Sequence, residues 1–285
     1  MKQIKNYVLA GPHGRPIVTD VILPEKTLSS IPIVVFCHGY KGFKDWGAWN
    51  QMTMNLANSG FCIIKFNFSF NGGTVEQPID FPDLEAFANN NYSKELDDLK
   101  QVIDWIYADP LFDHPVDRTN ICVMGHSRGG GIAAIAASED DRIKQLITLA
   151  AVSDFESRFE IGSETFKKWE EKGVKYVLNG RTKQQMPHYF QFFEDFLTHR
   201  DRLNIKRALT GLDKPHLIIH GDADTSVSIE AGHDMAKWSK HSEFKIIKGA
   251  DHVFGSSHPW GKDSISIQLQ QVIGYAVGFL KTNLA

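Results

Sequence analysis

A serine turn flanked by glycines, residues 125–129 (GHSRG), constrains the fold of this chain more than any other feature. It follows an apolar run typical of a buried strand, residues 121–124 (ICVM), and precedes a stretch of small residues typical of a tightly packed helix. Between a strand and a helix, a Gly-x-Ser-x-Gly turn strains the serine backbone and lifts its hydroxyl clear of the sheet. The helix directs free N–H groups and the positive end of its dipole at the same point. The pattern predicts that Ser127 is a nucleophile.

An acid and a base follow two further predicted strands in the C-terminal third of the chain. Residues 216–220 (HLIIH) lead into Asp224, and residues 244–247 (FKII) lead into His252. A serine needs a base to become a good nucleophile, and the base needs an acid to orient it. The chain order Ser127, Asp224, His252 is the order of α/β-hydrolases and differs from the two common serine-protease orders. We therefore expect these three residues to form a catalytic triad.

The acid and the base both have competitors. Asp222 precedes the predicted acid and is expected to hold its turn, while Asp154 follows another strand and is a more distant choice. His258 lies a few residues beyond the predicted base and is expected in the pocket or on the surface. His38 and His220 end strands, where a histidine more often holds a loop by hydrogen bonds than takes part in catalysis.

Two backbone amides are predicted to form an oxyanion hole. A buried strand over residues 33–37 leads into the loop 38–42 (HGYKG). In folds with this kind of turn, one donor is the amide after the nucleophile and the other comes from the loop after the third strand. The expected donors are the N–H groups of Arg128 and Tyr40.

Four motifs carry a resemblance that covers nearly the whole chain: residues 38–43 (HGYKGF), 125–130 (GHSRGG), 220–224 (HGDAD) and 251–252 (DH). By these motifs the chain resembles the α/β-hydrolase superfamily, and within it the branch of dienelactone hydrolases, feruloyl esterases and prolyl-oligopeptidase-like enzymes. The resemblance implies that the branch's catalytic serine, acid and histidine fall on the three triad residues. Dienelactone hydrolases use a cysteine nucleophile, so the serine in this chain argues against that activity.

Apolar runs alternate with helical patterns along the chain, which predicts an α/β fold whose mostly parallel sheet has helices on both faces. Eight strands are expected, near residues 7–9, 17–23, 32–37, 61–66, 119–124, 144–149, 215–220 and 243–248, the first two antiparallel. Ser93 is expected to cap a helix. Residues 153–212 interrupt the alternation, which predicts a helical cap inserted after the sixth strand. The core domain is then formed by residues 1–152 and 213–285.

The predicted cap is rich in aromatic residues and has helical patterns at residues 163–172 and 187–200. An insertion at this point is expected to cover the nucleophile. Most of its aromatic side chains are expected to pack the cap onto the core, and others to line an apolar pocket. With neighbours from the core, the expected pocket residues are His38, Phe155, Phe190, Phe193 and Trp260.

Composition and charge limit the expected partners. The net charge of −3 provides no basic field, so neither nucleic acid nor an acidic membrane is expected to bind. No apolar run is long enough to span a bilayer, and the N-terminal residues lack the apolar core of a signal peptide. Cys37, Cys62 and Cys122 lie in predicted buried strands, which indicates reduced thiols and a cytoplasmic protein. No metal-ligand or nucleotide-binding motif is present, so no metal or cofactor is expected. A homo-oligomer is left open but not indicated.

These patterns together favour a serine hydrolase, and within that class a carboxylesterase that cleaves small to medium acyl or aryl esters. An aminopeptidase-like peptidase and a thioesterase are alternatives, because both reactions use the same triad. A non-catalytic ligand-binding protein on this fold is the least favoured reading, since such proteins commonly lose a triad member and this chain has all three.

Overall fold

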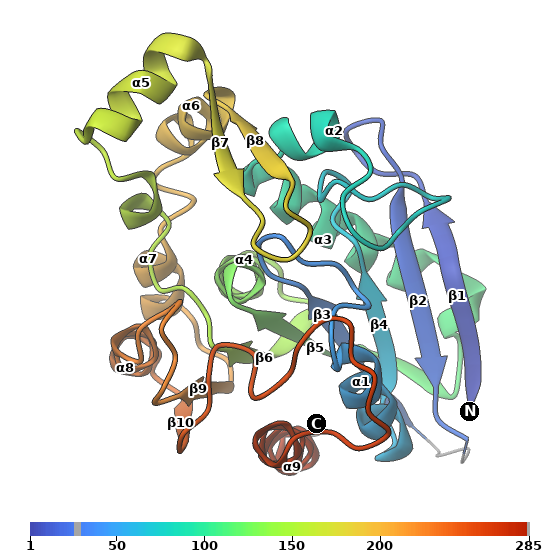
Figure 1. Ribbon diagram of the computed structural model, residues 1–285. Helices are drawn as coiled ribbons and strands as arrows, with labels where there is room; N and C mark the ends of the chain where they lie inside the picture. Colours follow the sequence, from blue (N-terminus) through green and yellow to red (C-terminus); the bar gives the residue numbers. More distant parts are fainter. Residues whose placement is uncertain (26–29, 284–285) are drawn as a thin grey trace.

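A mostly parallel sheet forms the centre of the computed structural model, which describes residues 1–25 and 30–283 (Figure 1). Within those residues the sheet has eight strands in the order β1-β2-β4-β3-β5-β6-β9-β10. The strands are β1 (Lys2–Leu9), β2 (Ile17–Leu23), β3 (Ile31–Cys37), β4 (Cys62–Phe66), β5 (Val116–His126), β6 (Ile143–Leu149), β9 (His216–Gly221) and β10 (Ser242–Ile247). β2 pairs antiparallel with both β1 and β4, and all the other pairs are parallel. The predicted fold class is confirmed.

Helices cover both faces of the sheet because the central strands are apolar on both sides. Along β3, Ile33 and Val35 belong to one buried cluster, while Val34 and Phe36 belong to another. The first cluster includes residues of α3 (Tyr92–Ala108), α4 (Arg128–Glu139) and α8 (Glu230–Trp238), and the second includes residues of α1 (Trp49–Asn58) and α9 (Ile267–Thr282). Strands buried on both faces are typical of parallel sheets. The short helices outside these layers are α2 (Leu84–Ala88), η1 (Pro110–Phe112) and η2 (Glu156–Phe159).

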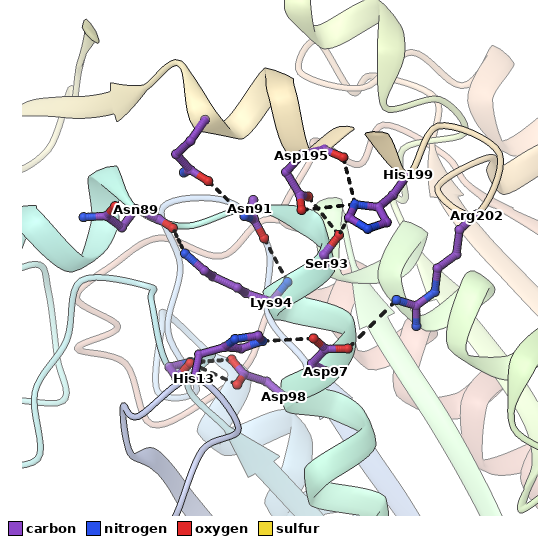
Figure 2. Close-up of polar contacts among 12 residues, drawn as sticks. His13, Asn89, Asn91, Ser93, Lys94, Asp97, Asp98, Asp195, His199 and Arg202 are labelled. Atoms are coloured by element: carbon purple, nitrogen blue, oxygen red, sulfur yellow. Dashed lines mark hydrogen bonds and ion pairs between the residues drawn. The ribbon is translucent and has the colours of Figure 1, made fainter. Parts of the chain in front are cut away.

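The N-cap of helix α3 lies two residues before the predicted one. Its N-cap is Asn91, whose Oδ1 accepts a hydrogen bond from the amide of Lys94 at 2.9 Å. The prediction that Ser93 caps this helix was wrong, because asparagine caps helices as well as serine does and Asn91 stands directly before the first turn. Ser93 lies inside that turn, and its hydroxyl donates to the carboxylate of Asp195 at 2.8 Å (Figure 2). This contact ties α3 to the segment inserted between β6 and β9.

That inserted segment, residues 153–212 and called the insertion below, adds no strand to the main sheet. It contains α5 (Glu164–Lys172), β7 (Val174–Leu178), β8 (Gln185–Tyr189), α6 (Gln191–Thr198) and α7 (Ile205–Thr210). The prediction of a wholly helical insertion was wrong, because β7 and β8 form an antiparallel hairpin. Pro187 resembled a helix start in the sequence, but it lies in β8. In the described part of the chain this hairpin has only two strands, both at an edge, where proline is tolerated.

The insertion packs on the core through aromatic rings. Phe155 stacks on Tyr92 of α3 with ring centroids 3.9 Å apart, and Phe192 lies 4.7 Å from the same ring. Phe159 and Phe196 also contact Tyr92 by their edges, and all five rings are buried. The insertion is therefore continuous with the main apolar core. None of the helices in the described ranges has the length and apolar character needed to cross a membrane.

Candidate active site

Ser127 stands at the turn between β5 and α4, at the carboxyl edge of the sheet. Its φ of 55° is unusual for a residue with a side chain, and such strain is often found at functional sites. A Cβ placed at Gly125 would lie 2.2 Å from the carbonyl oxygen of Gly129, so only glycine fits there. The Ser127 amide donates to the carbonyl of Leu149 at 2.9 Å, which fastens the turn to β6. The turn has the local geometry that its sequence predicted.

The structure brings Ser127, His252 and Asp224 together from three separate loops. His252 Nε2 lies 3.0 Å from Ser127 Oγ, and His252 Nδ1 lies 2.7 Å from Asp224 Oδ2. An ionised carboxylate accepts a hydrogen bond from Nδ1–H, which leaves Nε2 unprotonated and able to accept the serine proton. Because β5, β9 and β10 run parallel, their carboxyl ends meet at one edge of the sheet and place the three loops side by side.

Asp224 is held as an ion by its surroundings. Its side chain is inaccessible to solvent, and Oδ1 accepts hydrogen bonds from the amides of Ser226 and Val227 at 2.8 and 2.9 Å. Burial by itself would raise the pKa of this carboxyl, but hydrogen bonds from His220, His252 and the Val227 amide hold the pKa well below its usual range. A carboxylate that stays charged can stabilise a positive imidazole beside it.

The competing acids and histidines have local structural contacts away from Ser127. Asp222 Oδ1 accepts from the amide of Gly249 at 2.5 Å and so holds the turn, as expected. Asp154 accepts from two amides at the start of η2. His220 donates from Nε2 to a carbonyl of the loop after β9 at 2.9 Å, and His258 accepts from a backbone amide near α1.

His126 contacts the site in a way that the sequence did not reveal. Its Nε2 donates to the carbonyl oxygen of His252 at 2.9 Å, and its ring lies 5.0 Å from the ring of Trp49. Burial lowers the pKa of His126 to about 3, with a further lowering by the charge of His252, so the ring is neutral at neutral pH. His126 therefore anchors the loop that carries His252. The middle position of a Gly-x-Ser motif accepts many residues, and no sequence signal marked this one.

The loop after β3 lies directly against Ser127. A Cβ placed at Gly39 would approach Ser127 Cβ to 3.0 Å, and the amide of Gly42 donates to the carbonyl of Gly39 at 3.1 Å to close a turn. This turn contains Tyr40, and Arg128 is the first residue of α4, where an amide has no partner within its own helix. The assignment of these two amides as oxyanion donors stays a prediction.

A cavity of about 420 Å³ opens beside Ser127 and His252. Of the five predicted pocket residues only Phe155 lines it. Phe190 and Phe193 do not, which corrects the prediction. They pack against Phe166 of α5, with ring centroids 5.8 and 4.8 Å apart. An aromatic residue on an amphipathic segment contacts whichever apolar surface lies next to it, and here that surface is α5.

His38 and Trp260 are also absent from the lining of this cavity. His38 is buried below the loop, where its Nε2 accepts from the amide of Phe68 at 3.2 Å, and burial lowers its pKa to about 4. Trp260 packs against the apolar cluster around α1 and α9. His38 follows β3 and Trp260 follows the loop of His252 in sequence, but neither side chain lines the cavity.

The walls of the cavity combine aromatic rings with cations, which the sequence did not indicate. The Tyr40 hydroxyl and His188 Nε2 are 2.7 Å apart and join the loop after β3 to the hairpin. The further lining residues include Lys41, Tyr92, Arg128, Arg158, Phe159 and Lys175. In the ranges that the structure describes, no group of three or more histidine, cysteine or acidic side chains is arranged to hold a metal ion.

Comparisons with known proteins agree with this architecture. YcjY of Escherichia coli (strain K12), an uncharacterized protein, is 31% identical over 120 residues, which are 42% of this chain and 35% of YcjY. The solved structure of Est1E from Butyrivibrio proteoclasticus has a TM-score of 0.73 at 19% identity and covers 98% of both chains. A puromycin-hydrolyzing peptidase from Mycobacterium tuberculosis has a TM-score of 0.66 at 17% identity, over 100% of this chain and 39% of the peptidase. At these identities, the structural likeness shows the fold alone.

The family is shown by sequence. The model of the prolyl oligopeptidase family matches residues 49–274, which contain most of the sheet, the insertion and all three residues of the hydrogen-bonded chain at Ser127. The sheet order and the turn at Ser127 are those of the α/β-hydrolase fold. The chain belongs to the prolyl oligopeptidase family.

Proposed function

We propose that the chain is a serine carboxylesterase, which cleaves small to medium acyl or aryl esters through an acyl-enzyme on Ser127. The observation that carries this proposal is the chain of hydrogen bonds from Ser127 Oγ to His252 Nε2 at 3.0 Å and from His252 Nδ1 to Asp224 at 2.7 Å. A cavity of about 420 Å³ beside the hydroxyl supports it, because this volume suits a small ligand.

The reaction starts with proton transfer. Ser127 Oγ attacks the ester carbonyl while His252 Nε2 takes the hydroxyl proton, and the ionised Asp224 stabilises the imidazolium. The carbonyl oxygen becomes an oxyanion, for which the amides of Tyr40 and Arg128 are the proposed donors. Collapse of this intermediate breaks the ester C–O bond, and His252 gives its proton to the departing alcohol.

Hydrolysis of the acyl-enzyme repeats the same steps with water. His252 removes a proton from the water as it attacks the acyl carbonyl, and it returns that proton to Ser127 Oγ when the acid leaves. Residues 153–212 act in this proposal as a cap domain over the core formed by residues 1–152 and 213–285. Supporting this role, the insertion supplies much of the cavity wall, including Phe155 and Lys175.

An aminopeptidase-like peptidase is the second candidate, favoured by the family and by the likeness to the puromycin-hydrolyzing peptidase. A peptidase that reads a free amino group needs an anionic partner for it. Among the described residues, no aspartate or glutamate lines the cavity, and this favours the esterase. A thioesterase would use the same chemistry at Ser127, so a comparison of esters with thioesters separates these two activities.

The three cysteines support a reducing compartment. Cys37, Cys62 and Cys122 lie buried on β3, β4 and β5 as free thiols, and burial raises the pKa of all three. Buried neutral thiols behave as small apolar side chains and are common in proteins of reducing compartments. We therefore propose the cytoplasm as the location.

A fluorophosphonate probe tests the proposed function. It should label wild-type protein stoichiometrically and leave Ser127→Ala unlabelled, while circular dichroism shows that both proteins are folded. The labelled enzyme should hydrolyse para-nitrophenyl esters faster than the matching thioesters and aminoacyl arylamides. Faster cleavage of arylamides would establish the peptidase instead, and absence of labelling in folded wild-type protein would refute a competent nucleophile.

A further inference from the structure

The cavity beside Ser127 has an uneven balance of charge. Four cationic side chains line it, and no acidic side chain does so within the described residues. The cations come from separate parts of the chain: Lys41 from the loop after β3, Arg128 from α4, Arg158 from η2 and Lys175 from β7. A chain with a net charge of −3 has no general excess of cations, so this gathering is local.

One of the four cations already has an acidic partner. Arg128 pairs with the buried Glu95, its guanidinium nitrogen 3.2 Å from the carboxylate oxygen. Its guanidinium also lies over the rings of Tyr40 and Phe192, 4.4 and 5.2 Å from their centroids. The Glu95 carboxylate and these rings hold the Arg128 side chain, so we treat it as part of the cavity wall.

The other three cations have no such partner. In the described ranges, no carboxylate lies within 4.0 Å of Lys41, Arg158 or Lys175. Lys175 Nζ lies 3.7 Å from the centre of the Trp169 ring, and Arg158 reaches only a backbone carbonyl at 3.5 Å. Burial lowers the pKa of Lys175, with Glu160 opposing this, and burial and Arg128 lower the pKa of Lys41. Their charges are therefore incompletely balanced by the protein.

Several of these cations act on the same side chain of the cavity wall, His188. His188 is buried in the cavity wall, and its pKa is lowered to about 3, first by burial and then by the charges of Arg128, Lys175 and Lys41. Of these, Lys41 from the loop after β3 and Lys175 from β7 have no carboxylate partner and raise the electrostatic potential in the same space. In a partly enclosed cavity such a potential attracts an anion more strongly than it does at an open surface.

We propose that the natural substrate is an ester that carries a carboxylate, which Lys175 and Arg158 bind while aromatic rings hold the apolar part of the molecule. This inference rests on the proposed esterase function and names its substrate class. Aromatic residues such as Phe155 and Phe159 supply the apolar wall beside these cations. The carboxylate takes no part in the bond changes at Ser127, so it affects the selection of the substrate alone.

Two matched pairs of esters test this proposal. The mono-para-nitrophenyl ester of adipic acid is compared with para-nitrophenyl hexanoate, and para-carboxyphenyl hexanoate is compared with para-carbamoylphenyl hexanoate. The first pair places the carboxylate on the acyl side and the second on the alcohol side. In at least one pair, kcat/KM for the charged ester should exceed that for the neutral ester by on the order of fivefold, and added salt should shrink this ratio.

Variants of the cavity cations test whether the preference for the charged ester arises in the cavity. Lys175→Met and Arg158→Gln should lower the ratio toward one, and Lys175→Glu should lower it below the Lys175→Met value. Lys168→Gln removes an exposed cation of α5 outside the cavity and should leave the ratio unchanged. A preference that survives in all three cavity variants would overturn the proposal.

The same preparations are labelled with the fluorophosphonate probe. Labelled enzyme that turns over the neutral ester of each pair as fast as the charged one, or faster, overturns the anionic substrate while leaving the esterase intact. Folded protein that is neither labelled nor active on any of the four esters overturns both proposals.

Discussion

At the edge of the sheet, polar groups are placed by hydrogen bonds, whereas in the insertion the side chains are placed by apolar packing. Asp224 receives two backbone amides and the imidazole of His252 within 2.9 Å. Phe159 and Phe196 instead lie in a buried cluster of rings, where neighbours meet at varied angles. Hydrogen bonds to a charged group fix distance and direction. Ring packing fixes volume and tolerates several arrangements.

This difference separates the two tasks of the proposed enzyme. Proton transfer between Ser127 and His252 requires atoms placed to a fraction of an ångström, and the rigid strand ends supply that accuracy. Selection of a substrate requires a wall of suitable shape and charge, which the insertion supplies through Phe155, Arg158 and Lys175. Substitutions at the sheet edge should therefore change kcat, whereas those in the insertion should change stability or substrate preference.

The largest effect is expected from Asp224→Asn. The two amides that reach Oδ1 would hold the new amide oxygen, so its NH₂ group would face His252 Nδ1. That contact favours the tautomer with the proton on Nε2, which cannot accept a proton from Ser127. We expect kcat to fall by roughly 10³–10⁴-fold, as in comparable triads. Ester turnover measured on folded protein checks this, and a kcat within tenfold of wild type would show that the sheet edge does not act as described.

The sheet edge could be predicted because its signals are local. Ser127 lies between an apolar strand and a small-residue helix, and Asp224 and His252 directly follow apolar strands. Parallel strands bring their carboxyl ends together, so these three local sequence patterns were enough to predict that the residues lie side by side. The contact of His126 could not be predicted in this way, because its hydrogen-bond partner is a backbone carbonyl, and every residue has one.

The insertion was less predictable because its structure depends on distant neighbours. The hairpin strand β7 has no fully buried residue and carries no clear apolar face, and Pro187 favoured a helix in the sequence. The cavity cations were missed for a similar reason. Lys41 and Lys175 stand far apart in the chain, and nothing local distinguishes a lysine that faces a cavity from one that faces solvent.

Phe196→Ala tests whether the insertion shares the core. Phe196 is 3% exposed and contacts Tyr92 of α3, yet it does not line the cavity beside Ser127. Its truncation should lower the free energy of unfolding by about 3 kcal/mol, in a single transition followed by denaturant. The neighbouring Leu197→Ala, at a side chain that is 57% exposed, should change it by less than about 0.5 kcal/mol. Two separate transitions would mean that the insertion unfolds on its own.

A smaller effect is expected at His126, which holds the loop that carries His252 and does not line the cavity. His126→Phe keeps a ring beside Trp49 but removes the donor to the His252 carbonyl. We expect kcat to fall by about tenfold with little change in KM, since misplacement of the base slows proton transfer. His126→Gln carries an N–H donor and should recover part of the loss. Equal kcat values in the Phe and Gln variants would assign His126 to packing alone.

The smallest effect is expected at the ion pair that joins the insertion to α4. Arg202 donates to both carboxylate oxygens of Glu139, at 2.8 to 3.2 Å, but the two side chains are 39% and 37% exposed. Water and salt screen a pair of this kind, and ordering two long side chains offsets much of its attraction. Arg202→Gln should therefore change the free energy of unfolding by less than about 1 kcal/mol, well below the loss from Phe196→Ala. If denaturant unfolding gives the reverse order, ion pairs rather than rings hold the insertion on the core.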